Sequence, residues 1–195
     1  ETGIHPYVYI FPDLLIFIVL LNHFCMQTRL MAEDVPRDLL KTIGVPESRI
    51  ISVEYSERTK KLLCLLDISR SELMNLKPDV TRMLEINRMN IQVRGLILTI
   101  SGQDDTKYDC HSRYFAPWVG IPEDPVTGSA HTVLGPFWGR RLRKTHIRAE
   151  QCSMRGGSLD LRIHHNSKRI DITGETTLVM TGNIIIPAAA KRSRL

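Results

Sequence analysis

Residues 112–131 read SRYFAPWVGIPEDPVTGSAH, and this stretch carries the strongest structural signal in the 195-residue chain. A strand-like segment runs into a proline-rich loop, and the loop runs into a helix that begins with four small residues, Thr127, Gly128, Ser129 and Ala130. Small residues let a ligand approach the backbone, and the unpaired N–H groups of a helix start carry partial positive charge. The stretch therefore predicts a site for a carboxylate or phosphate of a small ligand.

Asp124 lies just ahead of the predicted helix start. The helix macrodipole favours the ionised carboxylate there, which makes Asp124 a poor proton donor. A fitting role is to accept a hydrogen bond from a substrate hydroxyl or amine, or to act as a base of modest strength while another group supplies the main acid or base. The alternative is that Asp124 and Thr127 only cap the helix, and their spacing leaves both interpretations open.

No other catalytic or metal-binding motif accompanies this stretch. Ser129 and His131 are two positions apart, a rotation of roughly 200° on a helix, so Asp124, Ser129 and His131 cannot form a hydrolase triad. The chain contains no GxSxG, GxxxxGK or GxGxxG string. The seven histidines form no His/Cys knuckle or HExxH pair, so we expect no metal.

The helix that starts near residue 127 has an apolar stripe at helical spacing. We interpret the stripe as core; it comprises Ala130, Val133, Leu134, Phe137, Trp138 and Leu142. Gly135-Pro136 interrupts it. An interior proline costs a helix about 3 kcal/mol, so we expect a kink or a break there.

The rest of the chain from residue 32 predicts short alternating elements in one domain, residues 32–187, followed by a basic tail, 188–195. We expect helices at 34–44 and 78–86, a capping box at 69–72, and strands at 50–55, 61–67, 91–101 and 107–115. Beyond residue 145 the apolar residues alternate with a period of two. This pattern predicts an antiparallel meander with strands at 147–152, 158–164, 168–173 and 176–186.

Residues 1–31 form a hydrophobic leader with an apolar run at 8–21. Spanning a bilayer takes about 20 apolar residues, and Pro12-Asp13 interrupts this shorter run. A signal peptide would begin with basic residues, but the first basic residue is Arg29. A buried strand or short helix is therefore favoured over a membrane segment, and we expect no membrane partner.

The composition is that of a globular protein, with 43% hydrophobic and 24% charged residues and a net charge of +5. Residues 140–195 hold 12 Lys and Arg against 4 Asp and Glu. The basic run 140–144 has no interleaved aromatic residues, so a solvated helix end is favoured over nucleic-acid binding. Four cysteines without a CxxC pair indicate free thiols in a reducing, cytoplasmic compartment.

Several strings together resemble the PhzF-like (phenazine biosynthesis-like) isomerase family. They are residues 112–117, the EDPVTGSAH string at 123–131, and the segments 93–99 and 151–157. The resemblance covers roughly residues 33–186. It implies an α+β fold, one half of a diaminopimelate-epimerase-like protein, in which a curved, mostly antiparallel sheet wraps a central helix.

The resemblance also implies an activity without cofactor or metal. Members take a proton from carbon in a small carboxylate-bearing substrate and return it at another position. Carried over to this chain, Asp124 contacts the substrate, while Gly128 and Ser129, with Thr127 and Ala130 beside them, hold its carboxylate at the helix start.

The departures from the family matter equally. The proton-transferring glutamate and a second histidine belong to an amino-terminal half, in Asn-x-Ser-Glu and Gly-His contexts that this sequence lacks. We therefore expect a truncated chain with a non-family leader, inactive alone. The alternative is a non-catalytic protein-interaction module that retains the fold and binds a protein partner or a second copy.

Overall fold

The computed structural model describes residues 35–86, 92–102 and 107–175 with their side chains, and three amino-terminal strands and Thr176 as backbone only. The amino-terminal strands are β1 (His5–Phe11), β2 (Leu14–Asn22) and β3 (Thr28–Arg29). The apolar run of the leader, 8–21, thus falls mostly on two strands, β1 and β2, which agrees with the strand alternative; the burial of its side chains lies outside what the structure describes. The basic tail and nearly all of the expected strand 176–186 lie outside the described residues.

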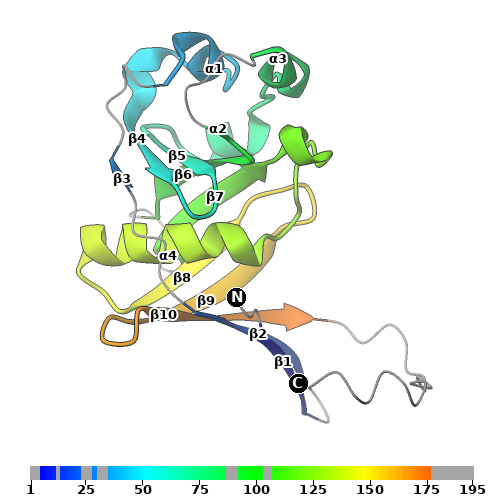
Figure 1. Ribbon diagram of the computed structural model, residues 1–195, viewed down its shortest axis with the longest axis vertical. Helices are drawn as coiled ribbons and strands as arrows, with labels where there is room; N and C mark the ends of the chain where they lie inside the picture. Colours follow the sequence, from blue (N-terminus) through cyan, green and yellow to red (C-terminus); the bar gives the residue numbers. More distant parts are fainter. Residues whose placement is uncertain are drawn as a thin grey trace, which may run out of the picture.

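One ten-stranded mixed sheet organises the chain, in the order β1-β2-β10-β9-β8-β7-β6-β5-β4-β3 (Figure 1). The pairs β5–β6 and β7–β8 are parallel and the other pairs are antiparallel. The remaining strands are β4 (Ile50–Ser56), β5 (Lys61–Leu66), β6 (Gly95–Ser101), β7 (Cys110–Phe115), β8 (His146–Gln151), β9 (Gly157–His164) and β10 (Arg169–Thr176). The predicted meander is confirmed for β8, β9 and β10.

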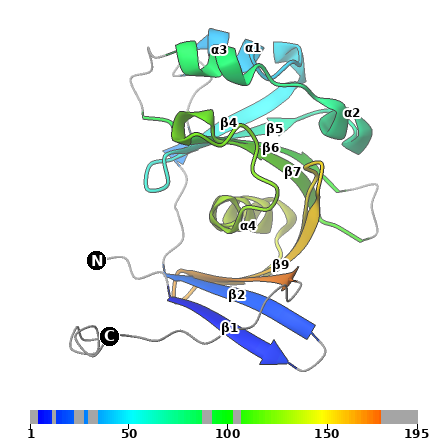
Figure 2. The ribbon, with the colours of Figure 1, turned by 90° about the vertical axis from the view of Figure 1, so that its right-hand side faces the viewer.

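The sheet curls around one long helix, α4 (Gly128–Leu142), which Figure 2 shows end-on in the hollow of the curve. The short helices α1 (Arg37–Lys41), α2 (Arg70–Asn75) and α3 (Val80–Glu85) lie on the outer side of the sheet. Two 3-10 turns, η2 (Glu47–Arg49) and η3 (Pro117–Val119), complete the described elements. The α+β class and the central helix in a curved sheet agree with expectation, while the specific likeness to the epimerase fold stays a prediction.

Strand β5 explains why two cores form on the two faces of the sheet. All six of its residues are buried. Leu63 and Leu65 point into the inner core around α4, whereas Leu62, Cys64 and Leu66 point into the outer core beneath the short helices. Because strand side chains alternate between faces, a continuous apolar run is what a strand covered on both sides requires.

Two predicted local signals around the short helices are confirmed, although α1 covers only Arg37–Lys41 of the expected 34–44. Ser69 Oγ accepts a hydrogen bond from the Glu72 N–H, and the Glu72 carboxylate accepts one from the Ser69 N–H, which completes the capping box of α2. Gly44 ends the α1 region with a φ of +87°. In the described part of the chain, no helix is long and apolar enough to cross a membrane.

Of the kink or break expected at Gly135-Pro136, the break is wrong, because α4 continues through both residues to Leu142, while the kink stays a prediction. Residues 130–139 are all buried, so packing outweighs the local cost of the proline. Gly135 also lies so close to β10 that a Cβ there would overlap Ile170 Cδ1. The glycine lets the helix approach the sheet, and the tight packing around this buried stretch holds Pro136 in a continuous helix.

Candidate functional site

The site begins at the amino-terminal end of α4, where two backbone N–H groups face outward. Among the described residues, nothing accepts a hydrogen bond from the N–H of Gly128 or of Ser129. Ser129 is exposed, Gly128 is half-buried, and a Cβ at Gly128 would meet no atom within 4 Å. Two unpaired donors at the positive end of a 15-residue helix, with open space in front, can bind a carboxylate or phosphate.

The side chains of Asp124 and Thr127 hydrogen-bond to each other and do not cap the helix. Thr127 Oγ1 donates a hydrogen bond to Asp124 Oδ2 at 2.5 Å. Thr127 makes no side-chain cap, although it occupies the N-cap position. The arrangement therefore differs from the simple capping alternative: one hydroxyl orients a carboxylate and the first helical N–H groups stay available.

Gln151, at the end of β8, fixes this loop from the side. Its Oε1 accepts a hydrogen bond from the Thr127 N–H at 2.8 Å, and its Nε2 donates to the Asp124 carbonyl at 2.5 Å and to Thr127 Oγ1 at 3.2 Å. Gln151 is fully buried. One amide thus satisfies three polar groups and sets the distance between Asp124 and the helix start.

The loop after β8 packs against the same segment. Ser153 Oγ donates to the Pro125 carbonyl at 2.7 Å and accepts the Gly156 N–H at 3.0 Å. At Gly157 a Cβ would overlap Val126 Cγ2, so the absence of a side chain allows the two loops to touch. The loop 123–127 is therefore held on two sides before any ligand arrives.

An ion pair between a buried arginine and a half-buried glutamate anchors the other end of the loop. Arg113 on β7 donates to both carboxylate oxygens of Glu123, at 2.7 and 2.8 Å. The same guanidinium donates to the carbonyls of Leu73 and Leu76 at 3.0 and 2.6 Å, at the end of α2. Arg113 is 7% exposed, so it joins α2, β7 and the Asp124 loop with little contact with bulk water.

Tyr114 and His131 are neutral groups close to the site. Burial, followed by the charge of Asp124, raises the pKa of Tyr114 to about 12, and its carbonyl accepts the Asp124 N–H at 3.0 Å. Burial lowers the pKa of His131 to about 4. His131 Nδ1 lies 2.7 Å from the Thr127 carbonyl, which fixes the proton on Nδ1, and its buried Nε2 has no partner among the described residues.

The structure thus brings Asp124, Thr127, Gly128 and Ser129 together, and Ala130 stands apart. The Ala130 side chain is buried in the inner core and its N–H bonds the Thr127 carbonyl at 3.2 Å. Ser129 is exposed and His131 is fully buried, so they face different surroundings, as the argument against a triad requires. The residues that sequence reasoning did not place are Arg113, Gln151 and Ser153; the string 151–157 was the available signal for the last two.

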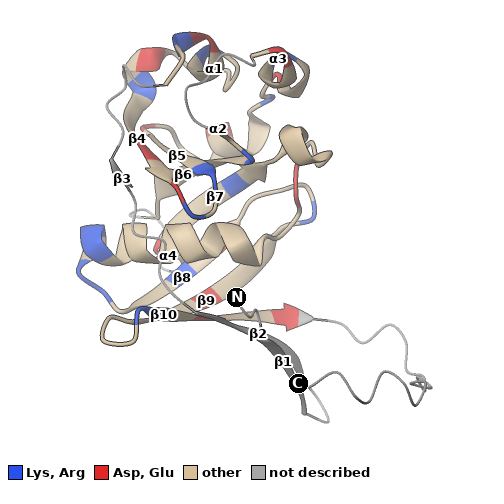
Figure 3. Ribbon diagram, in the orientation of Figure 1, with Lys and Arg blue, Asp and Glu red and all other residues tan. Residues whose placement is uncertain are grey.

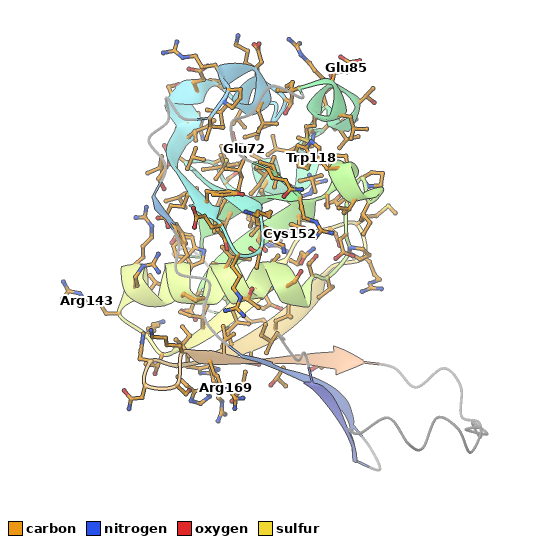
Figure 4. The ribbon with its side chains drawn as sticks, in the orientation of Figure 1. Glu72, Glu85, Trp118, Arg143, Cys152 and Arg169 are labelled. Carbon is orange, nitrogen blue, oxygen red and sulfur yellow. The ribbon has the colours of Figure 1, made fainter. Side chains whose placement is uncertain are left out.

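A second polar cluster lies beside Cys152, which Figure 4 labels. Ligand atoms of His111, Glu150 and Cys152 lie within 4.8 Å of one another. Arg70 donates to both oxygens of Glu150, at 2.7 and 2.8 Å, and this hydrogen bonding lowers the pKa of Glu150 to about 2. Burial raises the pKa of Cys152 to about 12, so the thiol stays protonated. His111 Nδ1 and Cys152 Sγ also lie at hydrogen-bond distance from Glu150 Oε2, at 2.7 and 3.2 Å, so one carboxylate joins these side chains in a polar network.

Comparison with known proteins gives a consistent family. The family model described as phenazine biosynthesis-like protein matches residues 19–182. A phenazine biosynthesis-like domain-containing protein of Rattus norvegicus is 44% identical over 151 residues, which are 75% of this chain and 51% of the relative. An uncharacterized isomerase of Pseudomonas aeruginosa is 38% identical over 147 residues, 75% of this chain and 50% of that protein.

Solved structures show the same similarity. A phenazine biosynthesis PhzC/PhzF protein from Clostridium difficile superposes with a TM-score of 0.68 at 29% identity, covering 88% of this chain and 58% of that one. A PhzF-family protein from Enterococcus faecalis superposes with a TM-score of 0.64 at 27% identity, and the match covers 85% of this chain and 61% of that one. The chain spans about half the length of the curated relatives it matches.

Proposed function

The chain belongs to the phenazine biosynthesis-like (PhzC-PhzF) family. We propose that it forms part of the active site of a cofactor-independent isomerase, which moves a proton on a small carboxylate-bearing substrate. The observation that carries the proposal is the pair of unpaired N–H groups at Gly128 and Ser129, next to an Asp124 carboxylate oriented by Thr127. The N–H groups hold the substrate carboxylate, and Asp124 accepts a hydrogen bond from a substrate hydroxyl or amine. Relatives described as isomerases support this assignment.

We expect little turnover from these 195 residues alone. Proton removal and return need an acid or base close to the carbon that reacts, a role that Asp124 does not fill when it accepts a hydrogen bond from the substrate. Among the described residues, the carboxylate adjacent to Asp124 in the chain is Glu123, and it is committed to Arg113. We assign the remaining proton-transfer group to the half of the full-length relatives that the matched region does not cover.

Binding can be tested without turnover. We would titrate the ¹⁵N-labelled chain with benzoate and cyclohexanecarboxylate, and use cyclohexanol as the uncharged control. The amide signals of Gly128 and Ser129 should shift with the two carboxylates and stay unchanged with the alcohol. Shifts spread over the basic surface, with none at these two amides, would overturn the carboxylate site.

Catalysis needs a separate experiment. A panel of amino acids and small cyclic acids in D₂O, followed by ¹H NMR, reports exchange at carbon. We expect no exchange with this chain and measurable exchange with a full-length relative, where the counterpart of Asp124→Asn lowers the rate. Exchange by this chain at the rate of the full-length relative would contradict the assignment of the second group.

A second candidate function is a non-catalytic interaction module, favoured by exposed apolar side chains near the site. Val119 and Ile121 are each 42% exposed on the loop after β7, and Met154 is fully exposed on the loop after β8. Light scattering after size-exclusion chromatography tests the self-association version of this candidate. A dimer that Ile121→Ser with Met154→Ser dissociates, and that Asp124→Ala with Ser129→Ala leaves intact, would favour the module over catalysis.

We further propose a cytoplasmic location. The support is that Cys64, Cys110 and Cys152 are unpaired and buried, as expected of thiols in a reducing compartment. Fractionation of cells that express the tagged chain tests this, and recovery in a membrane or secreted fraction would contradict it.

A further inference from the structure

A cavity lies at the other end of α4 from Asp124. It has a volume of about 800 Å³ and is lined by the ends of β6 and α4, by the segment before β7 and by the start of β8. Small-molecule sites fall in the range of roughly 300–1,000 Å³. Since α4 has 15 residues, its two ends are separated by about 22 Å, so this cavity is separate from the candidate isomerase site.

The lining is strongly basic. Among the lining residues that the structure describes, four are cationic, namely Lys107, Arg143, Lys144 and Arg148, and one is anionic, Asp109. These cations come from three separate parts of the chain: the segment before β7, the end of α4 and strand β8. Figure 3 shows blue residues gathered at the carboxyl end of α4 and on the neighbouring strand. One or two cations at the end of α4 would be enough to interact with the helix dipole. The four cationic side chains around this cavity are more than that interaction requires.

Asp109 neutralises only part of this charge. Its Oδ1 accepts from Lys144 Nζ at 2.5 Å and its Oδ2 accepts the Arg148 N–H at 2.8 Å. Burial opposes its ionisation, but these hydrogen bonds outweigh burial and lower the pKa of Asp109. Asp109 therefore pairs with Lys144 and with a backbone group, and the guanidinium of Arg148 remains available.

Two guanidinium groups have no acceptor in the described part of the chain. Arg143 and Arg148 are exposed, and no described carboxylate or carbonyl accepts from either side chain. Arg143 stands at the end of α4 in a left-handed conformation, with a φ of +54°, and its side chain points away from the helix body (Figure 4). By contrast, Arg140 pairs with Glu54 and Arg141 lies over the Phe137 ring.

We propose that this cavity binds a small polyanion, such as a phosphorylated metabolite, through Arg143 and Arg148. Guanidinium groups form paired hydrogen bonds with phosphate oxygens, and the partly enclosed space favours a compact ligand over a long strand. Lys107 lies 4.9 Å from the Tyr108 ring, and the Tyr108 hydroxyl lies 2.5 Å from Ser158 Oγ. These contacts place Tyr108 between Lys107 and the start of β9 in the wall of the cavity.

The test is isothermal titration of the chain with pyrophosphate and, separately, citrate, at 150 mM NaCl. Arg143→Ala with Arg148→Ala should weaken binding at least tenfold. The matched control is Arg140→Ala with Arg141→Ala, which removes the same charge outside the cavity and should change affinity less than threefold. Amide shifts with pyrophosphate should appear at Gly102, Tyr108 and Thr145 and not at Gly128 or Ser129, which separates this proposal from the isomerase assignment. Stronger binding of pyrophosphate identifies a phosphate ligand, and equal binding of citrate assigns the site to polyanions in general.

Three results would overturn the proposal. The first is no heat and no amide shift at Gly102, Tyr108 or Thr145 with millimolar pyrophosphate. The second is an equal loss of affinity in both arginine pairs, which would indicate a diffuse basic surface. The third is preferential binding of a 20-nucleotide RNA or DNA with a steep salt dependence and equal sensitivity to both pairs, which would indicate a nucleic-acid surface.

Discussion

Gln151 and Thr127 are joined by two hydrogen bonds, from the Thr127 N–H to Gln151 Oε1 and from Gln151 Nε2 to Thr127 Oγ1. Through this contact the end of β8 fixes the residue at which α4 begins, and Thr127 in turn orients Asp124. The candidate site is therefore held by a strand that follows the helix in the chain. Its geometry is built into the fold before a ligand arrives.

Replacing Gln151 should damage both stability and binding. Gln151→Leu keeps the approximate volume but leaves the Thr127 N–H and the Asp124 carbonyl without partners in a buried place. We expect the free energy of unfolding to fall by about 1–3 kcal/mol. Urea denaturation measures the loss, and benzoate titration should show weaker shifts at Gly128. Ser167→Ala, in an exposed turn, is the control and should stay within about 0.5 kcal/mol of wild type.

The two partners of the Arg113–Glu123 pair should differ in importance. Arg113→Met removes the donors to Glu123 and to the carbonyls that end α2, so it should cost about 3 kcal/mol. Glu123→Gln keeps a neutral acceptor, and the Glu123 side chain is 26% exposed, so it should cost about 1 kcal/mol. Denaturation of both variants checks the order, and equal losses would mean that the contacts to α2 contribute nothing.

The sequence predicted structure best where the local pattern of residues and the packing of the whole fold favour the same element. The capping box at Ser69, the buried run 61–66 and the alternating strands after residue 145 each carry their own signature, and each forms as expected. The small residues at 127–130 likewise predicted a helix start. What the sequence could not supply is contact between distant segments.

Gln151 and Arg113 illustrate that limit. Gln151 bonds Thr127, which lies 24 residues away in the sequence, and Arg113 bonds Glu123, which lies 10 residues away. Neither residue has a local sequence pattern that reveals its partner. The incorrect expectation of a break at Pro136 has the same origin, because burial of residues 130–139 inside the curved sheet outweighs a local penalty. Local propensity predicts elements, while the side chains that hold a site depend on how those elements pack.

Gly128 and Gly157 should separate binding from folding. Gly128→Ala places a methyl group in open space, so the free energy of unfolding should stay within about 1 kcal/mol of wild type while carboxylate binding weakens. Gly157→Ala forces Val126 to move, so the protein should lose about 1–3 kcal/mol. Denaturation and benzoate titration on both variants test this. Undiminished benzoate binding by Gly128→Ala would show that the ligand does not approach that N–H.

The buried His131 should make stability depend on pH. Its pKa is about 4 in the folded chain, against 6.5 for an ordinary histidine. Between these values the unfolded chain binds a proton that the folded chain does not, so the free energy of unfolding should fall as pH falls from 6.5 to 4. His131→Asn keeps an N–H for the Thr127 carbonyl and should flatten this decline, while His164→Asn, at an exposed position, should retain it. An imidazole NMR titration with a midpoint near 6.5 would contradict the expectation.

The close approach of Gly135 to Ile170 can be tested with a double-mutant cycle. Gly135→Ala improves helix propensity, yet its Cβ would overlap Ile170 Cδ1, so we expect a net loss of about 1–3 kcal/mol. Ile170→Val removes that methyl group and alone should cost about 0.5–1.5 kcal/mol. In the double variant the new methyl group occupies the vacated space, so the combined loss should be smaller than the sum by at least about 1 kcal/mol. Additive losses in urea denaturation would show that the helix position is set elsewhere along α4.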